Sequence, residues 1–515
     1  MELSIPILWI SIFLPLVITL IGLKIEEDNI ESVAYATGAS LLLPLLLVGA
    51  AAIKGMLGEG LVDPWMASFT GVGTLALALD GLSALVVAGV SLVTALVSFY
   101  SIPYMKTRVE EMREAGETPP SLNVYFFLYA LFSVAMLGLV YSTNMVLFYV
   151  FLELTLVPSF LLIAYYGYGD RKRIAILYFV WTHIGAVMFL SGMLYYGYHV
   201  GNFDYIDPAT MTPVTGGASL LGGAAKYVAM LIMFGLFVKM AVFGVHMWLP
   251  YAHAEAPTPI SALLSPNLIG LAGYALARIV VPVFPGFLQE YKWPLIYLAF
   301  LTIIYGGLVA LKQTDFKRFL AYSSVSQMGY MLLGIATLTP IGITGAMIHY
   351  LSHAIGKALL FMAAGVFITE LHGLRDIRLM GGLARKYPFT AALALLGFMH
   401  LVGMPPTIGM WSELFIIFGL FKDVNLSTQF IAMASLVILA LMVSAAYAFI
   451  NMRRIFYNKP RSEQAKAKSE VPSVLQYSML FIGIMGIVFF VWINPYYHGL
   501  LDVVKRMFLF AGIGG

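Results

Sequence analysis

The stretch VKMAVFGVHMWLP, residues 238–250, ends an apolar run that is long enough to cross a membrane but contains helix-disrupting residues. Gly244 and Pro250 fall inside it, and both residue types weaken a continuous helix. A second stretch, MHLVGMPPTIGMWSELF at 399–415, holds Pro405 and Pro406 at its centre. Both stretches therefore predict membrane helices that are broken part-way through the span.

The rest of the chain has the composition of a membrane protein. Of its 515 residues 61% are hydrophobic and 11% charged, and the mean hydropathy is +0.89, whereas a soluble domain carries about 25% charged residues. Only helices and closed barrels satisfy the backbone in lipid, and no alternation typical of barrel strands dominates. We therefore predict an all-α polytopic membrane protein. The absence of cysteine excludes disulfides, thiolate zinc sites and cysteine-ligated iron–sulfur clusters on this chain.

Fourteen segments have the length and apolarity of membrane spans. The first is interpreted as a transmembrane helix rather than a cleaved signal. The expected spans are 4–23, 33–53, 74–102, 123–141, 144–167, 174–198, 224–249, 259–283, 293–311, 318–337, 340–370, 388–420, 427–451 and 474–495.

Basic residues are distributed unevenly between the loops. Most of the 29 Lys and Arg residues follow odd-numbered spans, in groups such as Lys106 to Arg113, Arg171 to Arg173, Lys312, Lys317 and Arg318. By the positive-inside rule, this pattern places both termini outside. Three basic residues fall within spans instead. Of these, Arg278 is expected to extend to an interface, whereas Lys239 and Lys357 lie too deep for that.

The two interrupted spans, the seventh and the twelfth, lie five spans apart. This spacing predicts two five-helix repeats, spans 4–8 and 9–13, and because five is odd the second is inverted. Broken helices at corresponding positions of inverted repeats indicate an ion pathway. The predicted segments are 1–122 with three helices, 123–283 and 284–455 with one repeat each, and 456–515 with a loop and the last helix.

Three ionisable residues lie deep in these spans: Glu153 mid-span, Lys239 before the first break and Glu413 after the second. Each such charge costs roughly 2.5–3.5 kcal/mol at a helix centre, so it pairs or faces water. One interpretation is a structural ion pair between helices. The interpretation that we favour is a proton relay, with Glu153 and Lys239 as a pair.

His349, His353 and Lys357 follow one another at four-residue intervals and form one narrow stripe on a helix. Histidine titrates near neutral pH, which suits a proton carrier. A zinc site is the alternative at this spacing, but no third ligand lies nearby and Lys357 would repel a cation. A polar helix contact remains the other alternative.

His183, His246, His253 and Asp80 are weaker candidates for accessory roles. Each histidine is as consistent with a hydrogen-bonded structural role as with a relay. For Asp80 a structural role is favoured. No phosphate-binding loop, cofactor site or metal site is predicted on this chain.

Five motifs together resemble the antiporter-like membrane subunits of the complex I superfamily. They are FLELTLVPSFLLI, VKMAVFGVHMWLPYAHAEAPTPISALL, KQTDFKRFLAYSSVSQMGY, HYLSHAIGKALLFMAAG and GMPPTIGMWSELF. The resemblance covers spans 3 to 13, with the motifs in the family's order. The family includes chain 4 of NADH-quinone oxidoreductase, cation/proton antiporter subunits of the D type, and subunits of membrane-bound hydrogenases and sulfur reductases.

The resemblance implies fourteen helices in two inverted units and roles for five residues. Glu153 and Lys239 match the family's glutamate and its lysine partner, and His353 and Lys357 match its central relay. Glu413 matches its terminal residue, where many antiporter subunits have lysine, whereas His349 is a candidate from the stripe alone. Two positions depart from the family. Gly270 replaces a lysine or histidine of span 8, and Tyr251 replaces an acidic residue.

From the resemblance we expect a proton- or sodium-translocating subunit of a complex I-related, energy-converting complex in a prokaryotic-type cell membrane. The chain itself carries no redox active site. Iron–sulfur clusters, with nickel or flavin as further options, are expected in partner subunits. The expected partners are other membrane subunits, including antiporter-like ones, a peripheral redox arm and the lipid bilayer, with no nucleic acid. Two alternatives stay open: a subunit of a redox-independent antiporter, which Glu413 mildly disfavours, and a non-conducting structural spacer, which Gly270 does not exclude.

Overall fold

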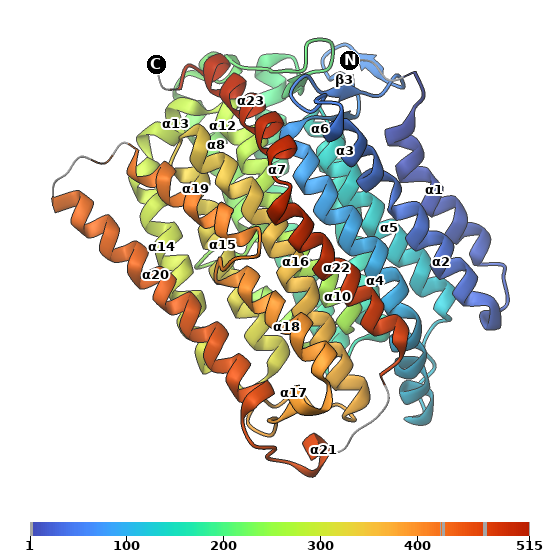
Figure 1. The fold of residues 1–515 in the computed structure, drawn as a ribbon. Helices are drawn as coiled ribbons and strands as arrows, with labels where there is room; N and C mark the ends of the chain where they lie inside the picture. Colours follow the sequence, from blue (N-terminus) through green and yellow to red (C-terminus); the bar gives the residue numbers. More distant parts are fainter. Residues whose placement is uncertain (1–3, 423, 425–427, 467–470, 514–515) are drawn as a thin grey trace.

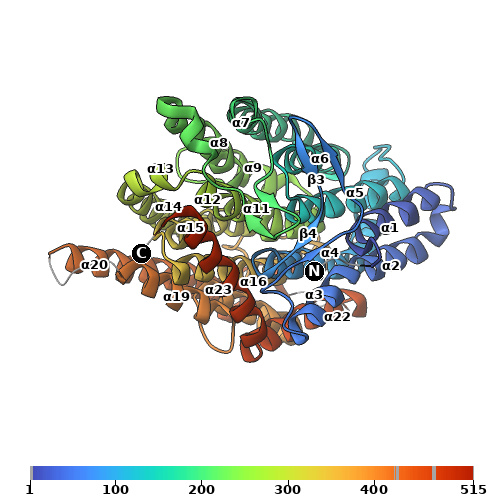
Figure 2. The ribbon, with the colours of Figure 1, turned by 90° about the horizontal axis from the view of Figure 1, so that it is seen from above.

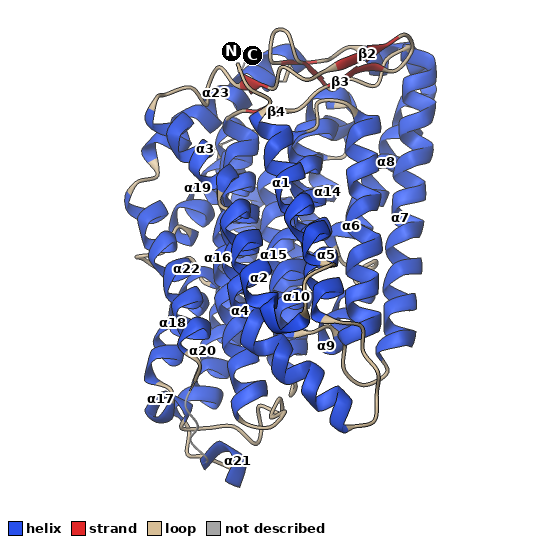
Figure 3. Ribbon diagram, turned by 90° about the vertical axis from the view of Figure 1, so that its right-hand side faces the viewer, coloured by secondary structure: helices blue, strands red, loops and turns tan. Residues whose placement is uncertain are grey.

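The helices of the protein stand side by side in one bundle, and short strands cover one of its ends (Figures 1 and 3). The computed structural model describes residues 4–422, 424, 428–466 and 471–513. Within them, eleven helices are long and apolar enough to cross a membrane. The all-α membrane class is therefore confirmed. The count of fourteen spans stays a prediction, because α1, α18 and α19 are shorter apolar helices and α15 is not among the eleven.

The first three predicted spans correspond to four helices. These are α1 (Ile7–Gly22), α2 (Ile30–Leu41), α3 (Leu43–Ile53) and α4 (Gly81–Glu114), with the short η1 (Glu27–Asn29) before α2. Antiparallel strand pairs cover the end where the chain starts and finishes (Figure 3). They join β1 (Leu61–Val62) to β4 (Ala78–Leu79), β2 (Ala67–Phe69) to β3 (Gly73–Leu75), and β5 (Ile206–Asp207) to β6 (Thr212–Pro213). The first and last helices thus begin and end at the same end of the bundle, which agrees with termini on one side of the membrane. That this side is the outside stays a prediction.

The first predicted five-helix unit comprises spans 4 to 8. Its elements are α5 (Leu122–Tyr141), α6 (Met145–Tyr166), α7 (Arg171–Val200), η2 (Gly217–Ala224), α8 (Ala225–Met240), α9 (Trp248–Glu255), α10 (Thr258–Leu263), η3 (Leu264–Leu268), α11 (Ile269–Ala275), η4 (Leu276–Val280) and α12 (Val281–Val283). Span 8 is continuous from Thr258 to Val283, but η3 and η4 are π-helical turns within it.

The second unit follows the connecting helix α13 (Pro285–Glu290). Its elements are α14 (Lys292–Lys312), α15 (Phe316–Ala336), α16 (Pro340–Glu370), α17 (Leu383–Lys386), α18 (Pro388–Leu401), α19 (Gly409–Phe421), α20 (Thr428–Met452) and η5 (Arg453–Tyr457). The chain ends with α21 (Glu463–Lys466), α22 (Ser473–Val491) and α23 (Asn494–Ala511). Seen from above, α4 and α16 lie in the middle of the bundle and α20 at its edge (Figure 2).

Both predicted helix breaks are confirmed. The helix α8 ends at Met240, where Ala241 takes a left-handed conformation (φ +57°), and α9 begins at Trp248. In the twelfth span α18 ends at Leu401 and α19 begins at Gly409. Pro250, however, does not make the first break. It lies in the first turn of α9, where its missing N–H costs no hydrogen bond.

Two sequence-based predictions around α4 were wrong. Residues 74–80, assigned to the third span, form β3, β4 and the cap of α4, because the Asp80 carboxylate accepts hydrogen bonds from the backbone N–H groups of Leu82 and Ser83 at 3.0 Å. Arg278 does not extend to an interface. Its side chain is 5% exposed and forms a two-point ion pair with Asp80, with Nη1 donating to Oδ2 at 2.8 Å. The favoured structural role of Asp80 agrees with both contacts.

The last helix, α23, was not predicted. It lies across the end of the bundle that carries the strands (Figure 2) and packs against α4, α16 and α12. Gly81, the first residue of α4, permits this contact, since a methyl group there would overlap the backbone of Gly499. The C-terminal segment therefore closes over the two central helices.

Candidate functional site

Glu153 on α6 lies at the outer side of the bundle and contacts His183 on α7. The Glu153 Oε2 and His183 Nδ1 atoms are 3.3 Å apart, and the side chains are 26% and 44% exposed. The other carboxylate oxygen, Oε1, is buried and has no hydrogen-bond partner. Lipid is a poor solvent for such a pair. This part of the α6–α7 face is therefore suited to contact with another polar surface.

Lys239 lies in the last turn of α8, directly before the first break. Its side chain is 3% exposed, and its Nζ atom has no hydrogen-bond partner. The expected pair with Glu153 is not formed among the described residues, because the Glu153 carboxylate contacts His183 instead. The free carbonyl groups at the end of α8 favour a cation at this position. Trp248 of α9 donates its indole N–H to the carbonyl of Val238 at 2.9 Å, which ties both sides of the break together.

Two histidines follow Lys239 along the chain. His246 lies inside the break, 3% exposed, with its ring centroid 5.1 Å from that of Tyr305. His253 on α9 is fully buried and stacks on Phe361 at 5.1 Å. None of their four ring nitrogens has a hydrogen-bond partner. Both side chains are therefore available to bound water rather than fixed in protein hydrogen bonds.

The three residues of the stripe on α16 are buried at the centre of the bundle. His349 Nδ1 lies 3.1 Å from the Ser412 hydroxyl of α19. Lys357 Nζ donates to the Leu320 carbonyl at 2.9 Å and to the Ser323 hydroxyl, both on α15. His353, between them, has no hydrogen-bond partner on either ring nitrogen. The stripe thus contacts α15 at its Lys357 end and α19 at its His349 end.

Glu413 follows the second break, on α19 beside Ser412. Its side chain is 6% exposed and its Oε1 atom is unpartnered. The turn at Gly403 packs against this carboxylate with a φ of +58°, and a side chain at that position would overlap the carboxylate. Glycine is therefore required here both for the backbone conformation and for the close approach.

Comparison with known proteins places this arrangement in a family. A family model described as "NADH:quinone oxidoreductase/Mrp antiporter, TM" matches residues 142–443, and one described as "NADH-Ubiquinone oxidoreductase (complex I), chain 5 N-terminus" matches residues 65–113. The chain belongs to the NADH:quinone oxidoreductase/Mrp antiporter family. All six relay candidates, from Glu153 to Glu413, lie within the first match.

Individual members of this antiporter family agree with the assignment. NADH-quinone oxidoreductase subunit M of Rickettsia prowazekii is 33% identical over 70% of this chain and 72% of its own length. F(420)H(2) dehydrogenase subunit M of Methanosarcina mazei is 32% identical over 79% of this chain and 80% of its own length. A chain of respiratory complex I from Thermus thermophilus has the same fold, with a TM-score of 0.81, 24% identity and coverage of 99% of this chain and 100% of that one.

The structure adds polar residues that sequence reasoning did not identify in this antiporter-like chain. His400 on α18 is 1% exposed, with Nδ1 3.0 Å from the hydroxyl of Ser352, the neighbour of His353. In the sequence, the position of His400 shortly before Pro405 and Pro406 could have marked it as a candidate residue. Lys317 was counted as a loop residue but is fully buried, and its Nζ donates to the carbonyl of Ala256. The described residues contain no group of three or more His, Cys, Asp or Glu side chains placed to hold a metal ion.

Proposed function

We propose that this chain translocates protons as an antiporter-like membrane subunit of a complex I-related complex driven by redox chemistry in partner subunits. One observation carries the proposal: Lys239, His353 and Glu413 are buried at the helix breaks and on the central helix, each with polar atoms that have no protein partner. Burying such groups is costly unless water or a mobile proton satisfies them. Hard cations such as sodium take oxygen ligands. Four of the six relay candidates, the two lysines and the two histidines, carry nitrogen instead, so the residue set favours protons.

The proposed path begins at Glu153, passes Lys239, follows the stripe His349, His353 and Lys357, and ends near Glu413. His246 and His253 flank the first part of this path with unpartnered ring nitrogens. His400 joins it through Ser352. Lys239 lies in the last turn of α8 and Glu413 lies near the start of α19, so the free backbone groups at these two helix ends favour a charge on each side chain.

Glu153 is the proposed point of control. It contacts His183 at 3.3 Å, and Lys239 is the partner that the sequence predicts for it. A charge that moves in a neighbouring subunit would shift Glu153 between these two partners. When Glu153 turns to His183, Lys239 loses its counter-charge and releases a proton into the path. The outward position of Glu153 and His183 supports contact with such a neighbour.

The assembly follows from the family. Subunits M of NADH-quinone oxidoreductase and of F(420)H(2) dehydrogenase are oxidoreductase components by name. We propose the same setting for this chain, in a bacterial-type membrane with other membrane subunits and a peripheral arm. Iron–sulfur clusters, with nickel or flavin as further options, are placed in those partners.

Glu153→Gln in the intact complex tests the proposed function. Glutamine keeps the shape but not the charge, so we expect coupled proton uptake to fall about tenfold or more, since one proton-transfer step contributes about 10²–10⁴-fold. Proton uptake by inverted vesicles measures this effect, alongside electron transfer with an uncoupler. Glu290→Gln, at an exposed position of α13, is the matched control. Wild-type uptake by the Glu153 variant would favour the non-conducting spacer.

A further inference from the structure

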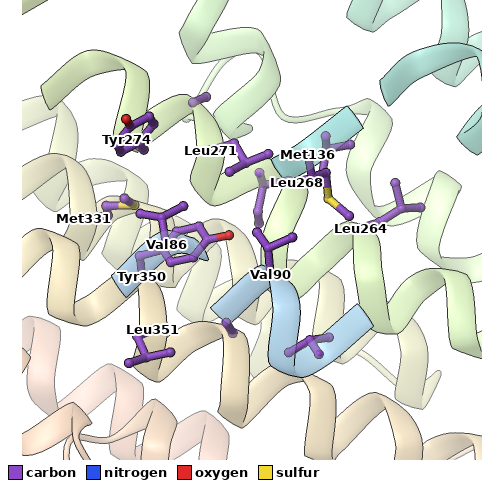
Figure 4. Packing of buried hydrophobic residues seen from close by; sticks show 14 of the residues in the cluster. Val86, Val90, Met136, Leu264, Leu268, Leu271, Tyr274, Met331, Tyr350 and Leu351 are labelled. Carbon is purple, nitrogen blue, oxygen red and sulfur yellow. The ribbon is translucent and has the colours of Figure 1, made fainter. Parts of the chain in front are cut away.

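Position 270 in span 8, where the family resemblance implies a lysine or a histidine, has no room for a basic side chain. A Cβ atom on Gly270 of α11 would lie 2.5 Å from Cδ2 and 2.6 Å from Cε2 of Tyr350. The Tyr350 ring is fully buried, and Figure 4 shows it within a cluster of apolar side chains that includes Val86 and Leu271. A basic side chain at position 270 is thus excluded by packing, and the link between Lys239 and His353 must use another group.

Asn267, one turn before Gly270, is a buried amide without hydrogen bonds. Its side chain is fully buried, and neither Oδ1 nor Nδ2 has a partner. A buried polar group left unsatisfied costs about 1–3 kcal/mol. Nearly all such groups in folded proteins bind protein atoms or ordered water. Because no atom of the described residues hydrogen-bonds this amide, its natural partner is water.

Asn267 lies on the element between the two halves of the path. The π-helical turn η3 that contains it packs against α16, while the following α11 packs against α8, the helix of Lys239. The helix α16, against which this turn packs, carries His353. Ser265, on its other side, shares a hydrogen bond of 2.6 Å with Ser324 of α15. Single π-turns inside α-helices are common at functional sites.

We propose that Asn267 holds a water molecule that carries a proton from Lys239 to His353, in place of the missing base at position 270. The inference rests on the proposed function. The Lys239 ammonium gives one proton to the water chain, the water on Asn267 gives one of its own protons to an unprotonated ring nitrogen of His353, and the amide is unchanged. An amide both donates and accepts hydrogen bonds, so it orients such a water without titrating. Asn267 is therefore a positioning residue.

The test compares Asn267→Ala with Asn267→Ser in the intact complex. Both remove a similar volume, but only serine keeps a hydroxyl that can anchor water. We expect coupled proton uptake by inverted vesicles to fall about tenfold in the alanine variant and to stay within about twofold of wild type in the serine variant. The solvent deuterium isotope effect on uptake is expected to rise only in the alanine variant, because proton transfer becomes the slow step.

Thr390→Val is the matched control. Thr390 on α18 is also fully buried with an unpartnered hydroxyl, but it belongs to no part of the proposed path.

Equal uptake by the alanine and serine variants, whether both high or both low, would overturn the inference, because the hydroxyl would then make no difference. Asn267→Leu, which fills the space, must behave like alanine. If Lys239→Ala and both Asn267 variants all pump normally, the proposed function fails as well. If only Lys239→Ala is inactive, the function stands without Asn267.

Discussion

Replacing Lys357 by arginine is expected to reduce coupled proton translocation about tenfold or more while leaving the complex assembled. The Lys357 ammonium is fully buried and donates to the Leu320 carbonyl at 2.9 Å and to Ser323. Arginine keeps the positive charge and several N–H donors, but it is not deprotonated in proteins. The substitution therefore separates a lysine that releases its proton from one that only supplies a fixed charge. Proton uptake by inverted vesicles, normalised to the amount of assembled complex, measures the effect.

Lys312→Arg is the control for the Lys357 variant. Lys312 is exposed at the end of α14, and its replacement is expected to leave uptake unchanged. If Lys357→Arg pumps at the wild-type rate, Lys357 is a structural cation. The stripe on α16 would then be a set of helix contacts rather than a path.

Arg278→Ala is expected to destabilise the protein by about 3–5 kcal/mol, because removal of one partner leaves a buried charge uncompensated. The side chains of Arg278 and Asp80 are 5% and 4% exposed. Because Asp80 caps α4 and Arg278 lies in span 8, the ion pair joins these two elements. Arg278 Nε also donates to the Tyr274 hydroxyl at 3.1 Å. A lower thermal unfolding midpoint of the purified complex, or loss of assembly, measures the cost.

The double substitution Asp80→Asn with Arg278→Met is the matched comparison. It removes both charges while keeping much of the volume, so it should be more stable than Arg278→Ala alone. If Arg278→Ala has the wild-type midpoint, the ion pair contributes little, and the structural role of Asp80 is limited to capping α4.

The sequence predicts the membrane class and both helix breaks because those features depend on local composition. Apolar length identifies the spans, and Gly244 together with Pro405 and Pro406 marks the two breaks in the sequence. The left-handed residue that ends α8 is Ala241, which gives no such signal. The start of α4, the π-turns of span 8 and the position of α23 could not be predicted in the same way. Each depends on contacts between distant segments, such as Gly81 against Gly499.

The same distinction between local composition and long-range contacts applies to the residues of the candidate site. Glu153, Lys239 and the α16 stripe are identifiable from sequence because charge is costly in a membrane. Their partners are not, since packing between helices decides that Glu153 contacts His183 and that His400 lies beside Ser352. Asn267 carries no charge and gives no sequence signal. Only the structure identifies Asn267 as a candidate, because there its buried side chain has no hydrogen bond.

The most direct test of the account is proton uptake by inverted vesicles that carry the intact complex, with Lys239→Ala compared against wild type. Lys226→Ala, at an exposed position near the start of the same helix, is the control. The account predicts that Lys239→Ala lowers the protons moved per electron in a complex that is still assembled. Unchanged pumping by an assembled Lys239→Ala complex would contradict it and would leave this chain as a scaffold.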